Sequence, residues 1–208
     1  MNRGGIKAVI LDLGNVCIDF DHMIAVRRIA EFAGRPAAEI SDLVFASGIC
    51  RRFEEGKVTP AGFFSGIKET LDLKISYEEF LPIWNEIFFL SDRNIEVQRL
   101  AKRLRRDYAI ASLSNINILH FEYLKANFSF LRLFDKPILS FELHLRKPDE
   151  EIYKKALELL NLKPAEVVYA DDQRAFTDKA NALGIRSFCY QGPDKLKKDF
   201  LSAGINVD

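Results

Sequence analysis

The sequence contains little sulfur and no long apolar run. Its 3 cysteines, Cys17, Cys50 and Cys189, are odd in number, widely spaced and without a CxxC pair. This predicts reduced thiols that serve packing, in a cytoplasmic protein. No uninterrupted hydrophobic run exceeds four residues, whereas a membrane-spanning helix needs about 20. Asp12 also interrupts the apolar stretch after the basic N-terminus, so we expect neither a signal peptide nor a membrane partner.

An excess of charge of either sign is also lacking. The 30 Lys and Arg residues balance the 30 Asp and Glu residues, whereas nucleic-acid readers usually carry a basic excess, so we expect no nucleic-acid partner. A composition of 48% hydrophobic residues with 11 Gly and 7 Pro excludes collagen-like, coiled-coil and disordered chains. The length suits one large domain, or a core with a modest insertion.

Several largely apolar segments have the pattern of buried strands. They are residues 8–12, 108–113, 167–170 and 185–190, with a shorter apolar pair at 138–139. From residue 92 onward these segments alternate with helical patterns. This alternation predicts an α/β fold with a doubly wound, Rossmann-like parallel sheet, which binds its ligands at the carboxyl ends of the strands.

Residues 21–89 contain no convincing strand and have the pattern of about four amphipathic helices. Thr59-Pro60 is typical of a helix start, and Ser76 with Glu79 forms a capping-box pattern before the helix that contains Trp84. A strand crossover needs only about a dozen residues, so the excess predicts a separate lid. We therefore expect residues 1–16 and 92–208 to form a Rossmann-like catalytic core. Residues 17–91 would form an all-helical cap, with hinges at 17–20 and 89–92.

Polar residues fall at or just beyond the ends of predicted elements. They are Asp12, Ser114-Asn115, Lys147 before Pro148, and Asp171-Asp172. Each alone has an ordinary interpretation: a turn residue, a helix N-cap, a solvated lysine before a Pro at the first helical position, or acids at a helix start. Together they place three carboxylates, a hydroxyl and an ammonium at one sheet edge, which packing does not require.

This combination of side chains indicates phosphoryl transfer. Three carboxylates suit a hard cation such as Mg²⁺. Lys147, Ser114 and backbone amides near Gly14 suit the oxygens of a phosphate. An anionic nucleophile can approach a phosphate only where positive charge offsets the repulsion.

The order of these motifs resembles the haloacid dehalogenase-like hydrolase superfamily, in the branch with a helical cap inserted after the first strand. The resemblance rests on Asp12-Leu13-Gly14-Asn15-Val16, Ser114-Asn115, Lys147-Pro148, and Asp171-Asp172 followed by Leu183-Gly184. It covers essentially the whole chain. The local sequences look closest to the sugar-phosphate phosphatases of that branch and to the phosphatase-like N-terminal domain of some epoxide hydrolases.

The resemblance implies a Mg²⁺-dependent phosphatase that hydrolyses a small phosphorylated metabolite, such as a sugar phosphate, through an aspartyl-phosphate on Asp12. Asp12 would be both nucleophile and metal ligand, and Lys147 would bridge Asp12 and the phosphate. The other implied metal ligands are the Gly14 carbonyl, Asp171 and Asp172. The other implied phosphate-binding residues are Ser114 and Asn115.

Two positions depart from the family pattern. Most phosphatases of the family have a second Asp where this chain has Gly14, and general acid–base help is typically worth about 10²- to 10⁴-fold in rate. A different residue such as Asp19, Asp21 or His120, or a water, could supply the proton. Alternatively the leaving group needs none, as in an anomeric sugar phosphate, or turnover is weak. The second departure is Phe176, at a position usually held by a small polar residue, which leaves open whether Asp172 binds the metal directly.

Within the predicted cap, residues 51–56 resemble the loop that related caps direct at the substrate. Arg51, Arg52 and Glu55 are therefore candidate substrate-binding residues, together with His120. The alternative is a solvated turn with Gly56 as the helix C-cap.

Three other functions remain open at this point. A metal-independent 2-haloacid dehalogenase is disfavoured by the acidic pair Asp171-Asp172, and phosphonate cleavage by the absence of any marked cap lysine. A relative that has lost turnover and acts as a binding module is kept open by Gly14 and Phe176. The oligomeric state and the physiological substrate are not determined by the sequence.

Overall fold

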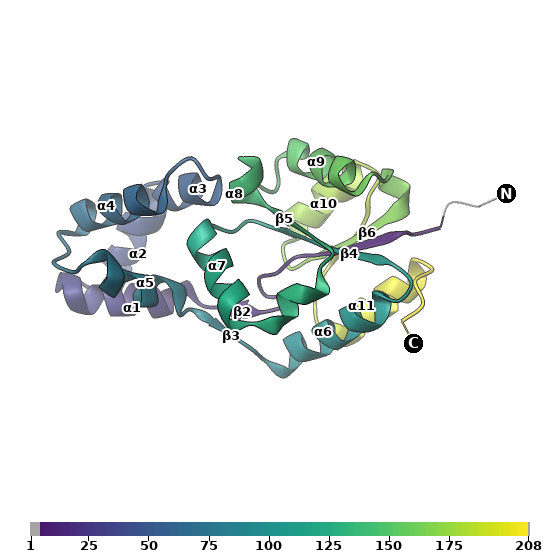
Figure 1. Cartoon of the computed structure of the whole chain (residues 1–208), viewed down its shortest axis with the longest axis horizontal. Coiled ribbons are helices and arrows are strands. Elements are labelled where there is room, and N and C mark those ends of the chain that lie inside the picture. The colour runs from purple at the N-terminus through teal and green to yellow at the C-terminus, as the bar shows by residue number, and fades with distance from the viewer. Residues whose placement is uncertain (1–4, 208) are drawn as a thin grey trace.

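The computed structural model describes residues 5–207 and is built on a five-stranded parallel sheet (Figure 1). Its strands are β1 (Ala8–Leu11), β4 (Ala109–Ser114), β5 (Lys136–Leu139), β6 (Val167–Asp171) and β7 (Arg186–Cys189). Their order, β5-β4-β1-β6-β7, puts β1 in the centre, where the chain changes its winding direction. The predicted α/β class with a doubly wound, Rossmann-like sheet is confirmed, and the carboxyl ends of β1 and β6, between which the winding reverses, mark the expected ligand site.

Helices cover both faces of the sheet, which explains why its central strand β1 is apolar throughout. Val9 and Leu11 pack toward α6 (Asp92–Leu104), α7 (Ile118–Asn127) and α11 (Pro193–Ser202). Ala8 and Ile10 point to the other face, against α9 (Glu150–Leu160) and α10 (Arg174–Ala182). Because successive residues of a strand face opposite sides, β1 needs apolar side chains at every position.

A separate group of helices lies beyond the carboxyl ends of the strands, at the left of Figure 1. Its members are α1 (His22–Ala33), α2 (Ala37–Ala46), α3 (Ile49–Glu54), α4 (Pro60–Leu71) and α5 (Tyr77–Asn85), five helices where about four were expected. They share an apolar cluster in which the Phe53 and Phe63 rings stack 4.3 Å apart. Thr59 accepts a hydrogen bond from the Gly62 N–H, and Ser76 closes its capping box with Glu79, so both predicted helix starts are confirmed.

The two chain segments that enter and leave this helical group pair with each other. β2 (Asp19–Phe20) and β3 (Phe88–Phe89) form a two-residue antiparallel ribbon. The expectation that residues 21–89 contain no strand is therefore wrong at Phe88–Phe89. A ribbon of two residues is too short to leave an alternating pattern in the sequence, and it forms because the two connections lie side by side.

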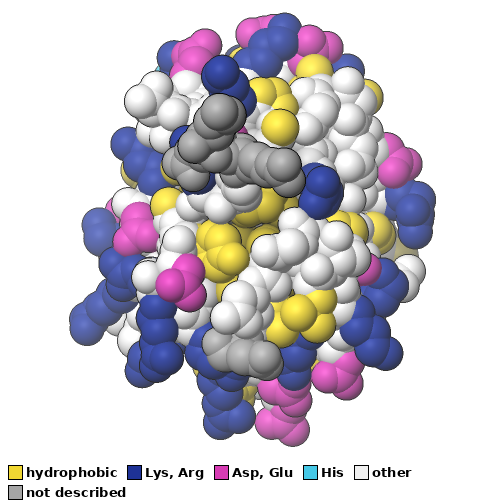
Figure 2. Space-filling model, turned by 90° about the vertical axis from the view of Figure 1, so that its right-hand side faces the viewer, with side chains coloured by type: hydrophobic (Ala, Val, Ile, Leu, Met, Phe, Trp, Pro, Cys, Tyr) yellow, Lys and Arg dark blue, Asp and Glu magenta, His cyan; other side chains and the backbone are white. Residues whose placement is uncertain are grey.

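The opposite end of the molecule carries mixed charge. Figure 2 shows this face with Lys and Arg side chains and Asp and Glu side chains both spread around its edge. Among residues 5–207, no helix combines the length and apolar character needed to cross a bilayer. Residues 1–4 and 208, which the sequence assigned to the core, lie outside the described part of the chain.

Short elements complete the connections around the sheet. They are α8 (Ser140–Leu143), η1 (Ser129–Leu133) and η2 (Pro164–Glu166). After α8 the chain reaches Lys147, whose peptide bond to Pro148 is cis. The prediction that Pro148 is the first residue of the next helix is wrong: α9 begins at Glu150 with Asp149 as its N-cap. The turn thereby leaves Lys147 outside the helix.

Candidate active site

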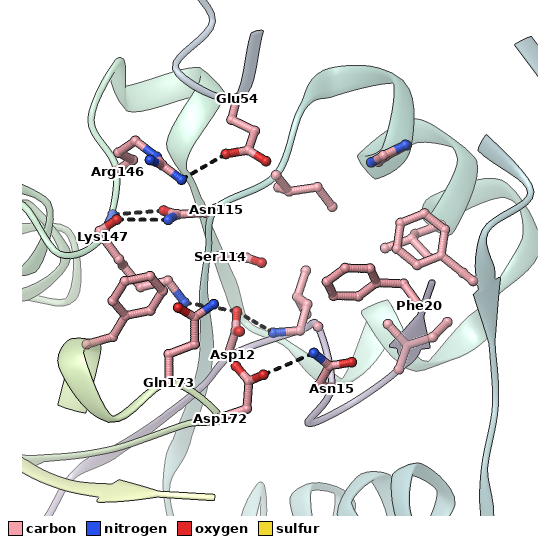
Figure 3. A pocket seen from close by; sticks show the side chains of 18 of the residues that line it. Asp12, Asn15, Phe20, Glu54, Ser114, Asn115, Arg146, Lys147, Asp172 and Gln173 are labelled. Atoms are coloured by element: carbon pink, nitrogen blue, oxygen red, sulfur yellow. Dashed lines mark hydrogen bonds and ion pairs between the residues drawn. The ribbon is translucent and has the colours of Figure 1, made fainter. Parts of the chain in front are cut away.

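A cavity of about 320 Å³ lies between the carboxyl ends of the strands and the helical group. Its sheet side includes Asp12, Ser114 and Lys147, and its opposite side includes Phe20 and Glu54 (Figure 3). The location matches the expectation for a doubly wound sheet. The structure therefore brings together the polar residues that end β1 and β4 and the lysine before Pro148.

Asp12 directly follows β1 and is fixed by the neighbouring strand. Its N–H donates to the Ala170 carbonyl at 2.9 Å, which continues the pairing with β6. Its Oδ1 accepts a hydrogen bond from the Leu13 N–H at 2.8 Å and lies 3.0 Å from Lys147 Nζ. Burial raises the pKa of Asp12 to about 7, although the charge of Lys147 opposes this rise. The Asp12 carboxylate thus lies at the cavity, and Lys147 compensates its negative charge only in part.

Lys147 is the cation at the centre of the site. Its side chain is 1% exposed, and its Nζ lies 3.0 Å from Asp12 Oδ1 and 2.5 Å from Asp171 Oδ2. Burial lowers the pKa of Lys147, but the two carboxylates more than offset this and raise it above its usual value. The Lys147 ammonium also lies 5.2 Å from the centre of the Phe176 ring. Phe176, the unusual residue after the acidic pair, is thus a buried packing residue beside this cation.

Asn115 holds the backbone of Lys147 in place. The Lys147 N–H donates to Asn115 Oδ1 at 2.8 Å, and Asn115 Nδ2 donates to the Lys147 carbonyl at 2.9 Å. The side chain of Asn115 therefore positions the lysine. Ser114, the last residue of β4, is 4% exposed and lines the cavity. The helix N-cap considered for this motif is instead Asn117, which caps α7.

The acidic pair at the end of β6 divides into a buried and a partly exposed residue. Asp171 is fully buried and accepts hydrogen bonds from Lys147, from the Tyr169 hydroxyl, and from the Gln173 N–H at 2.8 Å. Asp172 lines the cavity and accepts a hydrogen bond from Asn15 Nδ2 at 3.0 Å. Burial raises the pKa of Asp172. The pair thus presents one carboxylate to the lysine and one to the cavity.

The carboxylates of Asp12, Asp171 and Asp172 fit a divalent cation. Each offers an oxygen, and these three oxygens all lie within 4.8 Å of one another. Lys147 is the ammonium within ion-pair distance of two of them, so three ionised carboxylates would leave two negative charges uncompensated. A divalent cation with a preference for oxygen ligands would balance this charge. Gly14 lines the same cavity.

A side chain at position 14 would meet the Phe20 ring. A Cβ added to Gly14 would lie 2.6 Å from Cε1 of the Phe20 ring, which is closer than a real contact allows. Two of the substitutes considered from the sequence are occupied elsewhere. Asp19 accepts a hydrogen bond from Asn94 Nδ2 at 2.9 Å, and Asp21 caps α1. Neither lines the cavity.

His120 does line the cavity, but as a neutral ring. Its Nε2 lies 3.1 Å from the Trp84 carbonyl and its Nδ1 lies 3.0 Å from Asn117 Nδ2. A carbonyl accepts and an amide NH₂ donates, so these partners fit the tautomer with a proton on Nε2. Burial lowers the pKa of His120 to about 3. Near neutral pH this imidazole therefore has no extra proton to donate.

The candidate substrate residues on the helical side are displaced from the cavity. Arg51 and Arg52 lie within α3 rather than in a loop, and both are exposed. Glu55 forms two ion pairs: its Oε1 lies 3.1 Å from Arg51 Nε, and its Oε2 lies 2.7 Å from Lys57 Nζ. Glu55 does not line the cavity. The structure thus places none of these three residues in the cavity lining.

The residue of this segment that lines the cavity is Glu54. Its Oε2 lies 3.1 Å from Nη2 of Arg146, which also lines the cavity (Figure 3). Sequence reasoning missed Glu54, Arg146 and His22 as cavity residues. The sequence holds only a weak indication of Glu54 as a cavity residue. The apolar Phe53 indicates which face of the segment points inward, and Glu54 is the acid next to it.

The comparisons with known proteins identify the family. The haloacid dehalogenase-like hydrolase family matches residues 6–175. The chain belongs to this family of hydrolases. It is 24% identical over 189 residues to a D-ribitol-5-phosphate phosphatase of Bacteroides thetaiotaomicron, which covers 88% of this chain and 91% of that protein.

Solved structures of the family share the whole fold. A haloacid dehalogenase-like family enzyme of Bacteroides thetaiotaomicron, in complex with magnesium and inorganic phosphate, is 28% identical with a TM-score of 0.80. That match covers 90% of this chain and 95% of the other. A predicted hydrolase of the same kind from Porphyromonas gingivalis is 21% identical and has a TM-score of 0.80, covering 97% and 98% of the two chains. The Porphyromonas likeness supports the fold alone.

Proposed function

We propose that this hydrolase is a Mg²⁺-dependent phosphatase that acts on a small phosphorylated metabolite, with Asp12 as the nucleophile. The observation that carries the proposal is the buried cluster of Asp12, Lys147 and Asp171, of which Asp12 and Lys147 line the cavity. Burying three charges is costly, and packing alone does not repay it. Such a cluster is expected where a nucleophile must meet an anion.

The residues of the chain have distinct parts in this proposal. A carboxylate oxygen of Asp12 attacks phosphorus while the ester P–O bond breaks and the alcohol leaves. Water then hydrolyses the resulting aspartyl-phosphate, which releases inorganic phosphate and restores Asp12. Lys147 binds a phosphate oxygen and keeps Asp12 oriented, while the Ser114 hydroxyl and the Asn115 backbone N–H donate hydrogen bonds to the phosphoryl group. Mg²⁺, held by Asp12, Asp171, Asp172 and the Gly14 carbonyl, would supply positive charge against the phosphate.

A sugar or polyol phosphate is the substrate class we propose. The relative in Bacteroides thetaiotaomicron is a D-ribitol-5-phosphate phosphatase, and a cavity of about 320 Å³ is within the range for small ligands. The lining also includes Glu54, Arg146 and His22, which can form hydrogen bonds to hydroxyl groups. We further propose that residues 17–91 act as a cap over a core formed by residues 1–16 and 92–208.

A panel of phosphate esters tests this function. Wild-type protein should release inorganic phosphate from sugar or polyol monophosphates with Mg²⁺ and should lose this activity with EDTA. Asp12→Asn should be inactive, while the exposed control Asp107→Asn should match wild type. Phosphate release that persists in Asp12→Asn, or none from any ester, would refute the proposal. The latter result with retained ligand binding would favour a binding module, and EDTA-resistant chloride release from a 2-haloacid would favour a dehalogenase.

A further inference from the structure

Among the described residues, three carboxylates line the cavity: Asp12, Asp172 and Glu54. The first two belong to the acidic cluster that can hold a cation. Glu54 comes instead from the end of α3, on the cap side, and its carboxyl group points into the cavity above Ser114 in Figure 3. It is therefore the cavity acid that remains available for a role other than metal binding.

A general acid is still to be assigned, because the position two residues after Asp12 is Gly14. The Phe20 ring fills the space beside Gly14, Asp19 and Asp21 are bonded outside the cavity, and His120 is neutral. An alkoxide is a poor leaving group, so hydrolysis of an alkyl phosphate gains from a proton donor on the side facing away from Asp12.

We propose that Glu54 is the general acid–base residue of this phosphatase, an inference that rests on the function proposed above. As Asp12 forms its bond to phosphorus and the ester P–O bond breaks, the protonated Glu54 carboxyl gives its proton to the leaving oxygen, and an alcohol departs. The resulting Glu54 carboxylate takes a proton from the water that next attacks phosphorus. Inorganic phosphate leaves, Asp12 is free again, and Glu54 is protonated as at the start.

The surroundings of Glu54 support both halves of this cycle. Burial raises the pKa of Glu54 to about 7, with Arg146 and Lys147 lowering it and the charge of Glu55 raising it further. Both protonation states are therefore populated near neutral pH, as a residue that acts first as acid and then as base requires. The Glu54 side chain is 24% exposed, so water can reach it.

Contacts from the sheet side hold Glu54 over the cavity. The Ser140 hydroxyl lies 2.6 Å from the Glu54 carbonyl, and Arg146 Nη2 lies 3.1 Å from Glu54 Oε2. One residue further, His144 Nδ1 lies 2.9 Å from the Glu55 carbonyl. The end of α3 is thus seated on α8 and the turn after it. Packing of residues 17–91 against α8 would place Glu54 in the cavity and cover the cavity in one step.

The dependence on the leaving group tests the assignment. Glu54→Gln keeps the shape of the side chain and an oxygen for Arg146, but it cannot donate a carboxyl proton. The two substrates are an alkyl phosphate such as ribitol 5-phosphate and p-nitrophenyl phosphate, whose phenolate leaves without protonation. The measure is kcat/KM, because it reports only the steps up to departure of the leaving group and therefore excludes the later attack of water.

We expect Glu54→Gln to lower kcat/KM for the alkyl phosphate by about 10²- to 10⁴-fold and to change that for p-nitrophenyl phosphate by less than about tenfold. The alkaline fall of kcat/KM for the alkyl phosphate, expected as Glu54 loses its proton, should disappear in the variant. The matched control Glu55→Gln, a neighbouring carboxylate outside the cavity lining, should leave the ratio between the two substrates unchanged.

An equal loss on both substrates, or none on the alkyl phosphate, would overturn the assignment of Glu54 and leave the phosphatase standing. Asp12→Asn separates the two proposals, because it should abolish hydrolysis of both esters. If wild type shows no Asp12-dependent hydrolysis of either ester, the proposed function fails, and the role of Glu54 fails with it.

Discussion

At the scale of single residues, the two buried carboxylates beside Lys147 depend on its positive charge. Its side chain is 1% exposed between Asp12 and Asp171. Lys147→Met would leave both carboxylates buried without a cation, and loss of one partner of a buried pair costs about 3–5 kcal/mol. We expect that loss in urea unfolding at neutral pH in EDTA. The control Lys7→Gln removes an exposed partner of Glu166 and should change little, so equal stability of the two variants would contradict the account.

A second prediction at this scale concerns the contact between Gly14 and Phe20. Gly14→Ala would place its Cβ 2.6 Å from the ring, and such overpacking typically costs about 1–3 kcal/mol. In a Phe20→Leu background the ring is gone, so the same substitution should cost clearly less. The coupling between the two sites is measured by a double-mutant cycle in urea. Additive effects would show that Phe20 is not what keeps position 14 empty.

Sequence reasoning predicted the sheet side of the site better than the cap side. Asp12 follows one buried strand and Ser114 ends another, and the carboxyl ends of parallel strands meet at one edge, so the topology alone brings them together. Glu54 and Glu55 are adjacent, and only the orientation of α3 decides which of them faces the cavity. The obstruction by Phe20 depends on a ring six positions from Gly14 and leaves no pattern in the sequence.

At the scale of elements, the end of α3 packs closely on α8. A Cβ on Gly56 would lie 2.1 Å from the Phe141 carbonyl, while Gly34, with a similar φ of 62° against 63°, has nothing within 4 Å. An alanine at either position is strained by its positive φ, at a cost of about 1 kcal/mol. In Gly56→Ala the added Cβ would also collide with the Phe141 carbonyl, so the end of α3 would have to move away from α8.

We therefore expect both variants to lose some stability, and Gly56→Ala to lose kcat/KM as well, by at least tenfold. Urea unfolding and steady-state kinetics, measured on the same preparations, give the two quantities. A Gly34→Ala variant with the same kinetic loss, or a Gly56→Ala variant with unchanged kcat/KM, would show that the seat of α3 on α8 does not matter for activity.

Two helix starts, at Thr59 and Ser76, were easier to predict than the short ribbon. The Thr59 cap and the Ser76 capping box use local hydrogen bonds between residues three apart, so they can be identified from a few letters of sequence. The pairing of β2 with β3 joins residues about 70 positions apart. It depends on how the whole helical group returns to the sheet, which local patterns do not specify.

At the scale of the whole molecule, the acidic cluster couples stability to metal and pH. Mg²⁺ that binds only the folded protein should stabilise it by about 2.7 kcal/mol at 100 times its Kd. The pKa of Asp12 is raised to about 7 without metal, so protons compete with the cation below that pH. The stabilisation at a fixed Mg²⁺ concentration should therefore grow as pH rises through about 7.

Thermal unfolding with MgCl₂, against KCl of equal ionic strength, measures this effect. Asp172→Asn removes one of the three clustered carboxylates and should show a smaller shift at the same concentration. An equal shift in Asp172→Asn and wild type would place the stabilising cation elsewhere, and a shift independent of pH would remove Asp12 from its ligands.

The central claim is that Asp12 forms a covalent bond to phosphorus, and the most direct measurement is the site of the phosphoryl group during turnover. The reaction is stopped with acid while a good phosphate ester is in excess, and the peptides are mapped by mass spectrometry. We predict a phosphoryl group on Asp12 in the peptide that contains β1, absent from Asp12→Asn. Rapid hydrolysis with no phosphorylated peptide, or with the phosphoryl group on another residue, would contradict the account.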